Sequence, residues 1–216
     1  MSLTLLFHPL SSFCWKALVA LYEGDISFER HVLDLLDETV RQRFRTLWPL
    51  GKMPVLRDEA RGRTVPEATI IIEYLATHYP ACASLVPSAP ELAWQVRLRD
   101  RLFDLYVSDP MQKIVGDRLR PEGAKDPQGV EQARSLISTT YAVIEREMSG
   151  RTWAVGDDFT MADCSAAPAL YYANLVAPLG DAHPNAAAYL ARLMARPSFA
   201  RVLAEAEPYR SMFPKE

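Results

Sequence analysis

The sequence has few of the features that mark secreted, membrane or nucleic-acid-binding proteins. Its three cysteines (Cys14, Cys82 and Cys164) are odd in number and far apart, which does not suit a disulfide framework. No apolar run approaches the roughly 18 residues of a membrane span. The 24 basic residues do not outnumber the 27 acidic ones, so there is no electrostatic signal for nucleic acid. These absences predict a protein of a reducing compartment, with neither a membrane nor a nucleic acid as partner.

Sequence patterns for targeting, metal and nucleotide sites are also missing. The first nine residues have no basic segment before their short apolar run, so they do not read as a targeting signal, and we expect a cytoplasmic location. The four histidines are scattered without metal-ligand spacing, and we expect no metal cofactor. Neither a phosphate loop nor a dinucleotide fingerprint is present.

The composition that remains is that of a folded protein with two differently patterned parts. Hydrophobic residues make up 49% and charged residues 24% of 216 residues, which suits one large or two small domains. Up to about residue 80, strand patterns at 3–7, 28–33, 53–56 and 64–65 alternate with helical patterns at 13–24, 38–47 and 66–79. Beyond residue 90 only helical patterns are convincing, at 91–115, 128–148, 160–176, 185–195 and 197–205. We therefore predict an α/β domain over residues 1–80, a proline-containing linker over 81–90 and an all-helical domain over 91–216.

Ser11 and Ser12 stand where the first predicted strand gives way to a helix. Hydroxyls and unpaired N–H groups at the positive end of a helix dipole suit an anion. An ordinary N-cap serine would explain the same position. Cys14 lies in the first turn of that helix, where a thiolate would be stabilised, although a buried structural cysteine is the commoner case.

Two further positions can bind a peptide-like ligand. A cis Met53-Pro54 bond at the start of a strand would turn the Met53 backbone outward to pair with an extended peptide, whereas a trans proline would only stiffen the loop. Glu67 and Ala68 begin a helix, so the Ala68 N–H could hold a carboxylate and Glu67 an ammonium group. The alternative is that Glu67 merely complements the helix dipole.

The motif at residues 160–163 indicates a structural role. Thr160 and Asp163 have the spacing of a capping box, which would start a buried helix and carries no catalytic implication.

Taken together, four segments resemble the cytosolic glutathione transferase superfamily over nearly the whole chain. They are Pro9-Leu-Ser-Ser-Phe-Cys-Trp-Lys16, Pro49-Leu-Gly-Lys-Met-Pro-Val-Leu56, Val65-Pro-Glu-Ala-Thr-Ile-Ile-Ile-Glu-Tyr-Leu75 and Phe159-Thr-Met-Ala-Asp163. The first segment is similar to the serine-type, zeta- and theta-like classes. The resemblance implies a thioredoxin-like N-terminal domain followed by an all-helical C-terminal domain.

The resemblance also implies glutathione as co-substrate, a small apolar electrophile as second substrate and a homodimer as the assembly. By this resemblance Ser11 activates the thiol. The implied glutathione contacts are Ser12, Lys52, Met53, Pro54, Glu67 and Ala68. For the electrophile we expect a cleft between the domains, walled by Leu10, Phe13, Phe103 and Tyr106.

The sequence departs from the family pattern at two positions, and the first of them, Ala68, keeps an alternative open. Ala68 replaces the usual Ser or Thr and removes one hydroxyl contact, worth about 0.5 to 1.5 kcal/mol, and Trp48 replaces the usual Asn before Pro49. The alternative is a binding or regulatory protein with this fold and no transferase activity. A disulfide reductase of the thioredoxin type is excluded because the chain has no Cys-x-x-Cys motif.

Overall fold

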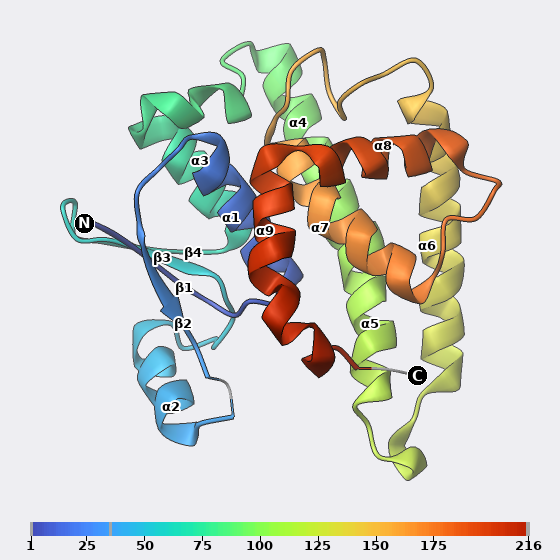
Figure 1. Cartoon of the computed structure of the whole chain (residues 1–216), viewed down its shortest axis with the longest axis horizontal. Helices are drawn as coiled ribbons and strands as arrows, with labels where there is room; N and C mark the ends of the chain where they lie inside the picture. Colours follow the sequence, from blue (N-terminus) through green and yellow to red (C-terminus); the bar gives the residue numbers. More distant parts are fainter. Residues whose placement is uncertain (1, 35, 215–216) are drawn as a thin grey trace.

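A four-stranded mixed sheet forms the N-terminal part of the molecule (Figure 1). The computed structural model describes residues 2–34 and 36–214. The strand order is β2-β1-β3-β4, with β1 parallel to β2 and antiparallel to β3, and β3 antiparallel to β4. The strands are β1 (Leu3–Phe7), β2 (Glu29–Val32), β3 (Val55–Asp58) and β4 (Arg63–Pro66).

Both faces of this sheet are covered by helices because side chains alternate along each strand. Leu3, Leu5 and Phe7 of β1 belong to the main core, together with residues of α1 (Ser12–Glu23) and α3 (Ala68–His78). Leu6 points to the opposite face, where it joins a smaller cluster with Phe44 of α2 (Glu38–Leu47). The result is a helix–sheet–helix sandwich, as the α/β alternation of the sequence predicts.

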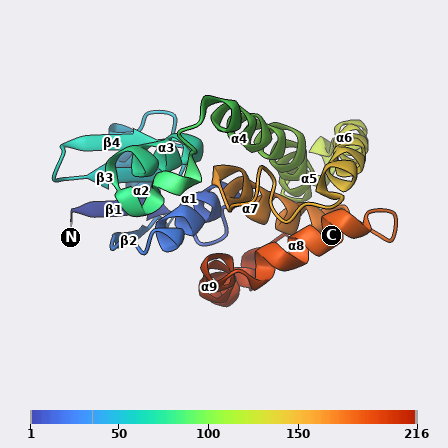
Figure 2. The ribbon, with the colours of Figure 1, turned by 90° about the horizontal axis from the view of Figure 1, so that it is seen from above.

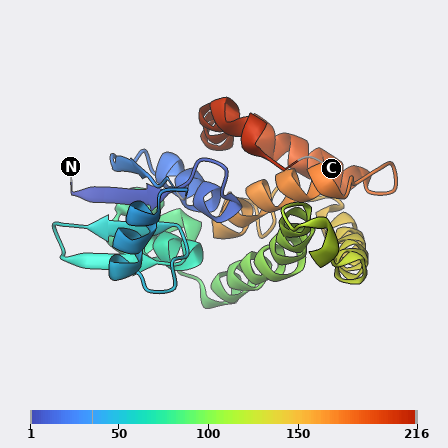
Figure 3. The ribbon, with the colours of Figure 1, turned by 90° about the horizontal axis from the view of Figure 1, so that it is seen from below.

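The second part of the molecule is all helical and is built around α7 (Met161–Val176), of whose 16 residues 14 are buried. Figures 2 and 3 show α7 between α4 on one side and α8 and α9 on the other. α7 also packs directly on α1, so the two parts share one continuous core. The remaining helices are η1 (Pro80–Leu85), α4 (Pro90–Phe103), η2 (Asp104–Ser108), α5 (Asp109–Arg118), η3 (Glu122–Ala124), α6 (Pro127–Met148), α8 (Pro184–Ala195), α9 (Pro197–Ala206) and η4 (Glu207–Met212).

The long helix expected over 91–115 has a different form from the one its periodicity predicts. It consists of α4 and α5 joined by η2, a π-helical turn. Pro110, in the first turn of α5, has no N–H to donate to a preceding carbonyl, and its ring crowds that turn. A locally widened helix absorbs this misfit and, as π-turns commonly do, it lies beside a cavity that is described below.

The structure confirms the predicted fold class, a thioredoxin-like part followed by a helical part. Residues 80–85 form the short helix η1, with Cys82 and Leu85 buried, so part of the expected linker is packed against the body of the protein. The domain division at 81–90 itself stays a prediction. Within the described residues, no helix is long and apolar enough to cross a membrane.

The predicted capping box at Thr160 and Asp163 is present, and Asp163 does more than cap α7. Its fully buried carboxylate accepts hydrogen bonds from the backbone N–H of Thr160 (2.9 Å), the backbone N–H of Ala154 (2.9 Å) and the hydroxyl of Tyr189 (2.6 Å). One side chain therefore joins the loop before α7, the start of α7 and α8.

Replacement of Asp163 by Ala is expected to lower the free energy of unfolding by about 3 to 5 kcal/mol, because it leaves several buried donors without an acceptor. Urea denaturation measures this loss. Asp157→Ala, an exposed acid in the same loop, is the matched control and is expected to change stability by less than about 0.5 kcal/mol. Equal stability of the two variants would contradict the structural role given to Asp163.

Candidate functional site

The register of the sheet brings three loops together at one edge. Leu6 at the end of β1 pairs with Val55 at the start of β3, and Val55 pairs with Pro66 at the end of β4. The turn that contains Ser11 and Ser12, which we call the serine turn, follows β1. Met53-Pro54 precedes β3, and Glu67 follows β4. Because neighbouring strands are about 4.8 Å apart, these loops emerge within roughly 10 Å of one another. The sites predicted from three separate stretches of sequence therefore lie side by side.

Ser11, and not Ser12, is the N-cap of α1. Its Oγ accepts a hydrogen bond from the backbone N–H of Cys14 at 3.3 Å, and the side chain is half-buried. Ser12 is the first helical residue and is 7% exposed. An acceptor role leaves the Ser11 hydroxyl proton able to point outward. The capping and donor functions are therefore compatible in this residue.

Cys14 is a buried structural thiol. The residue is 0% exposed, and burial raises the pKa of the Cys14 thiol to about 12, although hydrogen bonds to Ser11 and His8 act in the opposite direction. At neutral pH the group is therefore protonated and shielded from solvent. Of the two interpretations of Cys14, the structure supports the structural one.

Of the two alternatives for the Met53-Pro54 bond, the structure has the cis form. Met53 is half-buried and Lys52, just before it, is exposed. Asp109 lies at the start of α5 and lines a cavity described below. Burial raises the pKa of Asp109, while the positive charges of Arg101 and Lys52 oppose this shift.

Glu67 has a backbone conformation that is unusual for a residue with a side chain, with φ 69° and ψ 121°. It is the N-cap residue of α3, but its side chain makes no capping hydrogen bond. The exposed carboxylate thus lies beside the first turn of α3, where Ala68 is buried and N–H groups have no partner inside the helix. Such backbone strain concentrates at functional sites.

Next to this helix start is a cavity of about 510 Å³ between α3 and α4. Five of its twelve lining residues are acidic and two are basic. It is lined by Phe13, Glu67, Ala68, Thr69, Ile70, Glu73, Arg97, Asp100, Arg101, Asp104, Leu105 and Asp109. With N–H groups at one point and charged side chains of both signs around it, this headgroup cavity, as we call it, can accommodate a zwitterion.

A second, smaller cavity of about 160 Å³ lies on the other side of the serine turn. Its wall is mostly apolar and aromatic, and we call it the aromatic cavity. It is lined by Leu10, Trp15, Tyr171, Tyr172, Leu175, Leu203, Ala206, Arg210 and Phe213. Tyr172 donates a hydrogen bond to the Leu10 carbonyl (2.9 Å), and the ring of Phe213 stacks on that of Tyr172 with 5.6 Å between centroids.

Comparison with known proteins decides the family. The model of the glutathione S-transferase N-terminal domain matches residues 5–83, and that of the C-terminal domain matches residues 127–192. A solved glutathione S-transferase of Methylobacterium radiotolerans, in complex with glutathione sulfonate, is 30% identical with a TM-score of 0.79 and covers 93% of each chain. The chain belongs to the glutathione S-transferase family.

Other relatives agree with this membership. A glutathione S-transferase of Methylobacillus flagellatus KT, solved with glutathione bound, is 27% identical with a TM-score of 0.85 over 93% of this chain and 98% of its own. A probable maleylacetoacetate isomerase of Caenorhabditis elegans is 29% identical over 169 residues, which are 76% of this chain and 75% of the relative. A relative named for an isomerisation is thus similar to three quarters of this chain.

The structure separates the four residues that were expected to wall the electrophile cleft. Phe103 is 2% exposed and belongs to the core. Tyr106 is 49% exposed on η2 and lines neither cavity. Leu10 lines the aromatic cavity, whereas Phe13 lines the headgroup cavity. The two expected cleft residues after the linker are therefore divided between the core and the surface.

Sequence reasoning missed the residues that do wall the aromatic cavity. Tyr171 and Tyr172 lie in the largely buried helix α7, and Phe213 comes from the segment after η4. Two adjacent hydroxyl-bearing rings in a buried helix were the available signal, since buried tyrosines need hydrogen-bond partners. The role of Phe213 has no local signal, because it depends on how the end of the chain folds back.

Replacement of Glu67 by Gly is expected to give a protein that is more stable than Glu67→Ala by about 1 kcal/mol. Both variants lose the same carboxylate, but only glycine adopts a positive φ without steric cost. Chemical denaturation of the two variants checks this difference. If Glu67→Ala were as stable as Glu67→Gly, the backbone at this position would be relaxed rather than strained.

Proposed function

We propose that this family member is a serine-type, zeta- or theta-like glutathione transferase that activates glutathione as a thiolate at Ser11. The thiolate would attack a small apolar electrophile or drive a glutathione-dependent isomerisation. The observation that supports this most is the register that joins Leu6, Val55 and Pro66, because it gathers the three loops on which an extended tripeptide would lie.

The headgroup of glutathione fits the start of α3. Its carboxylate would accept from the N–H of Ala68 and the rest of the first turn, where the helix dipole favours negative charge. Its ammonium group would face Glu67 and the other acidic residues that line the headgroup cavity. Because Ala68 lacks a hydroxyl, this residue offers the carboxylate only its backbone N–H.

The middle and far end of the tripeptide fit the edge of the sheet. The backbone N–H and C=O of Met53 would pair with the cysteinyl unit in the manner of an added strand, with Pro54 fixing their direction. Lys52, exposed on the same loop, would attract the carboxylate at the other end of glutathione. Ser12 lies too deep for a primary contact and would support the turn.

Thiol activation would come from Ser11 and the helix behind it. A hydroxyl that donates to sulfur favours the thiolate over the thiol, and the N-terminus of α1 adds a positive potential. Cys14 takes no part because it is buried and protonated at neutral pH.

We place the electrophile in the aromatic cavity, since it adjoins Leu10 and therefore the serine turn. The similarity to a probable maleylacetoacetate isomerase favours the isomerisation option.

We further propose a cytoplasmic homodimer with no metal cofactor. Ala68 favours the second candidate, a binding protein of this fold without transferase activity; binding of glutathione without any turnover would support it.

Replacement of Ser11 by Ala is expected to reduce kcat with a generic electrophile by about 10- to 1000-fold, which is the cost of one positioned donor. Glutathione affinity, measured by calorimetry, is expected to change much less. Ser12→Ala is the control within the same turn and is expected to retain activity. Full turnover in Ser11→Ala, with loss in Ser12→Ala or Cys14→Ala, would reassign the activating residue.

Replacement of Leu175 by Ala is expected to change the relative kcat/KM of several electrophiles while leaving glutathione affinity unchanged. Leu175 lines the aromatic cavity and is 47% exposed, so the substitution costs little stability. Tyr106→Ala, similarly exposed but outside both cavities, is the matched control. A shift in electrophile preference with Tyr106→Ala alone would return the second substrate to the cleft that the sequence predicted.

A further inference from the structure

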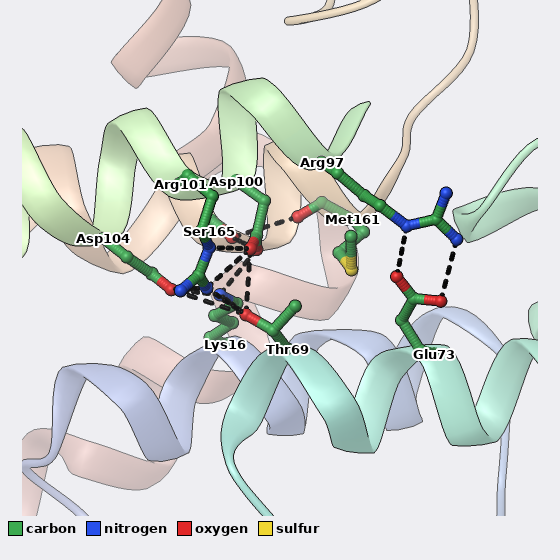
Figure 4. A network of polar contacts seen from close by, with 9 residues as sticks. All are labelled: Lys16, Thr69, Glu73, Arg97, Asp100, Arg101, Asp104, Met161 and Ser165. Carbon is green, nitrogen blue, oxygen red and sulfur yellow. Dashed lines mark hydrogen bonds and ion pairs between the residues drawn. The ribbon is translucent and has the colours of Figure 1, made fainter. Parts of the chain in front are cut away.

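Lys16 is a fully buried cation that the proposed chemistry does not use. It lies on α1, five residues after Ser11, and is 1% exposed. Its Nζ is 2.6 Å from Asp100 Oδ1 and 2.8 Å from Asp104 Oδ2, and it donates to Thr69 Oγ1 at 2.7 Å. Figure 4 shows these groups converging between α1, α3 and α4. One ammonium group thus joins three helices.

The two carboxylates are themselves fully engaged. Asp100 accepts from the Ser165 hydroxyl (2.5 Å) and from Arg101 (2.8 Å), and Asp104 accepts from Arg101 (2.5 Å). Burial tends to raise the pKa of Asp100, but Lys16, Ser165 and Arg101 outweigh it and hold the pKa below its ordinary value. A buried ion cluster of this kind is costly to desolvate and does not by itself imply stability. The role of the cluster is therefore sought in the part of the chain that it holds in place.

The group that it fixes is the first turn of α3. Thr69 Oγ1 receives hydrogen bonds from Lys16 and from Arg101 (2.6 Å), and it donates to Asp100 (2.9 Å). Thr69 is the second residue of α3, directly after Ala68, whose N–H lies in the proposed headgroup site. The N-cap residue Glu67 makes no side-chain capping bond. Among the hydrogen bonds described for this turn, those of Thr69 are its side-chain anchors.

We propose that Lys16 is a positioning residue for glutathione: through Thr69 it holds the first turn of α3 in the orientation that aims its N–H groups at the headgroup carboxylate. This inference rests on the proposed glutathione site. It assigns to the cluster a function beyond joining the two parts of the chain. Because Lys16 touches no substrate atom, its effect falls on glutathione binding and leaves the electrophile unaffected.

The simpler alternative is a clamp between the two parts of the molecule. A second ion pair provides the matched control, because Arg196 also joins α1 to the helical part, through two hydrogen bonds to Glu23 (2.7 and 2.6 Å). Glu23 is at the far end of α1 and Arg196 just before α9, and neither lines a cavity described above. Glu23→Gln therefore weakens a clamp without touching the headgroup cavity.

The experiment compares Thr69→Val, Lys16→Met, the double variant and Glu23→Gln in the full chain. Calorimetry gives the Kd of glutathione, steady-state kinetics the KM of each substrate, and urea denaturation the stability. We expect Thr69→Val to raise the Kd about three- to tenfold, the range of one hydrogen bond, and Lys16→Met to raise it by about tenfold or more. The KM of the electrophile is expected to stay within about twofold of wild type.

The double variant and the control distinguish positioning from clamping. If Lys16 acts through Thr69, the double variant weakens glutathione binding no further than Lys16→Met alone. Glu23→Gln is expected to lose stability with an unchanged Kd. Additive effects, or an unchanged Kd in the folded Thr69→Val and Lys16→Met variants, overturn the inference. Should Lys16→Met not fold, Thr69→Val decides the question by itself. Wild-type protein that fails to bind glutathione overturns the proposed function as well.

Discussion

The burial of α1 on both sides is the constraint on which the rest of the structure depends. Nine of its twelve residues are buried, because the sheet and α3 cover one side while α7 and α9 cover the other. The two parts of the chain consequently share one hydrophobic core. A helix in this position cannot move without disturbing both parts. Its N-terminus, where the serine turn lies, is therefore held rigidly.

Two polar contacts extend that rigidity into the serine turn itself. The indole N–H of Trp15 donates to the Pro9 carbonyl (2.5 Å), and the Tyr172 hydroxyl donates to the Leu10 carbonyl. Both donors are aromatic side chains of the shared core. The carbonyls just before Ser11 are thus held by α1 and α7 together, which is the kind of support that a precisely placed catalytic hydroxyl requires.

The parts of this molecule that sequence could predict are those governed by local rules. β1, α2 (Glu38–Leu47) and the Thr160 cap follow from periodicity, capping chemistry and strand length, and the cis Met53-Pro54 bond follows from motif context. Ser11, Met53 and Glu67 could be named from the sequence as candidate site residues, but their proximity depends on strand register. The π-turn at η2 was not predicted, because an analysis of hydrophobic periodicity assumes a helix of uniform geometry.

The walls of the two cavities could not be predicted for a different physical reason. The sequence shows that Leu102, Phe103, Tyr106 and Val107 are apolar or aromatic, but not which of them meet the core. Phe103 packs inward at the end of α4, whereas Tyr106 is half exposed because it lies within the widened turn η2, where the spacing of a regular α-helix no longer holds. Similarly, no local signal shows that Phe213 folds back onto Tyr172.

The position of the serine turn between the cavities follows from helix geometry. Phe13 and Trp15 are two residues apart, about 200° around the axis of α1, so their side chains leave on opposite sides. Phe13 enters the headgroup cavity and Trp15 the aromatic cavity. The first turn of α1 therefore separates a charged compartment from an apolar one, and Ser11 caps the helix at their boundary. A thiol bound at Ser11 would have its polar headgroup on one side and an apolar reaction partner on the other.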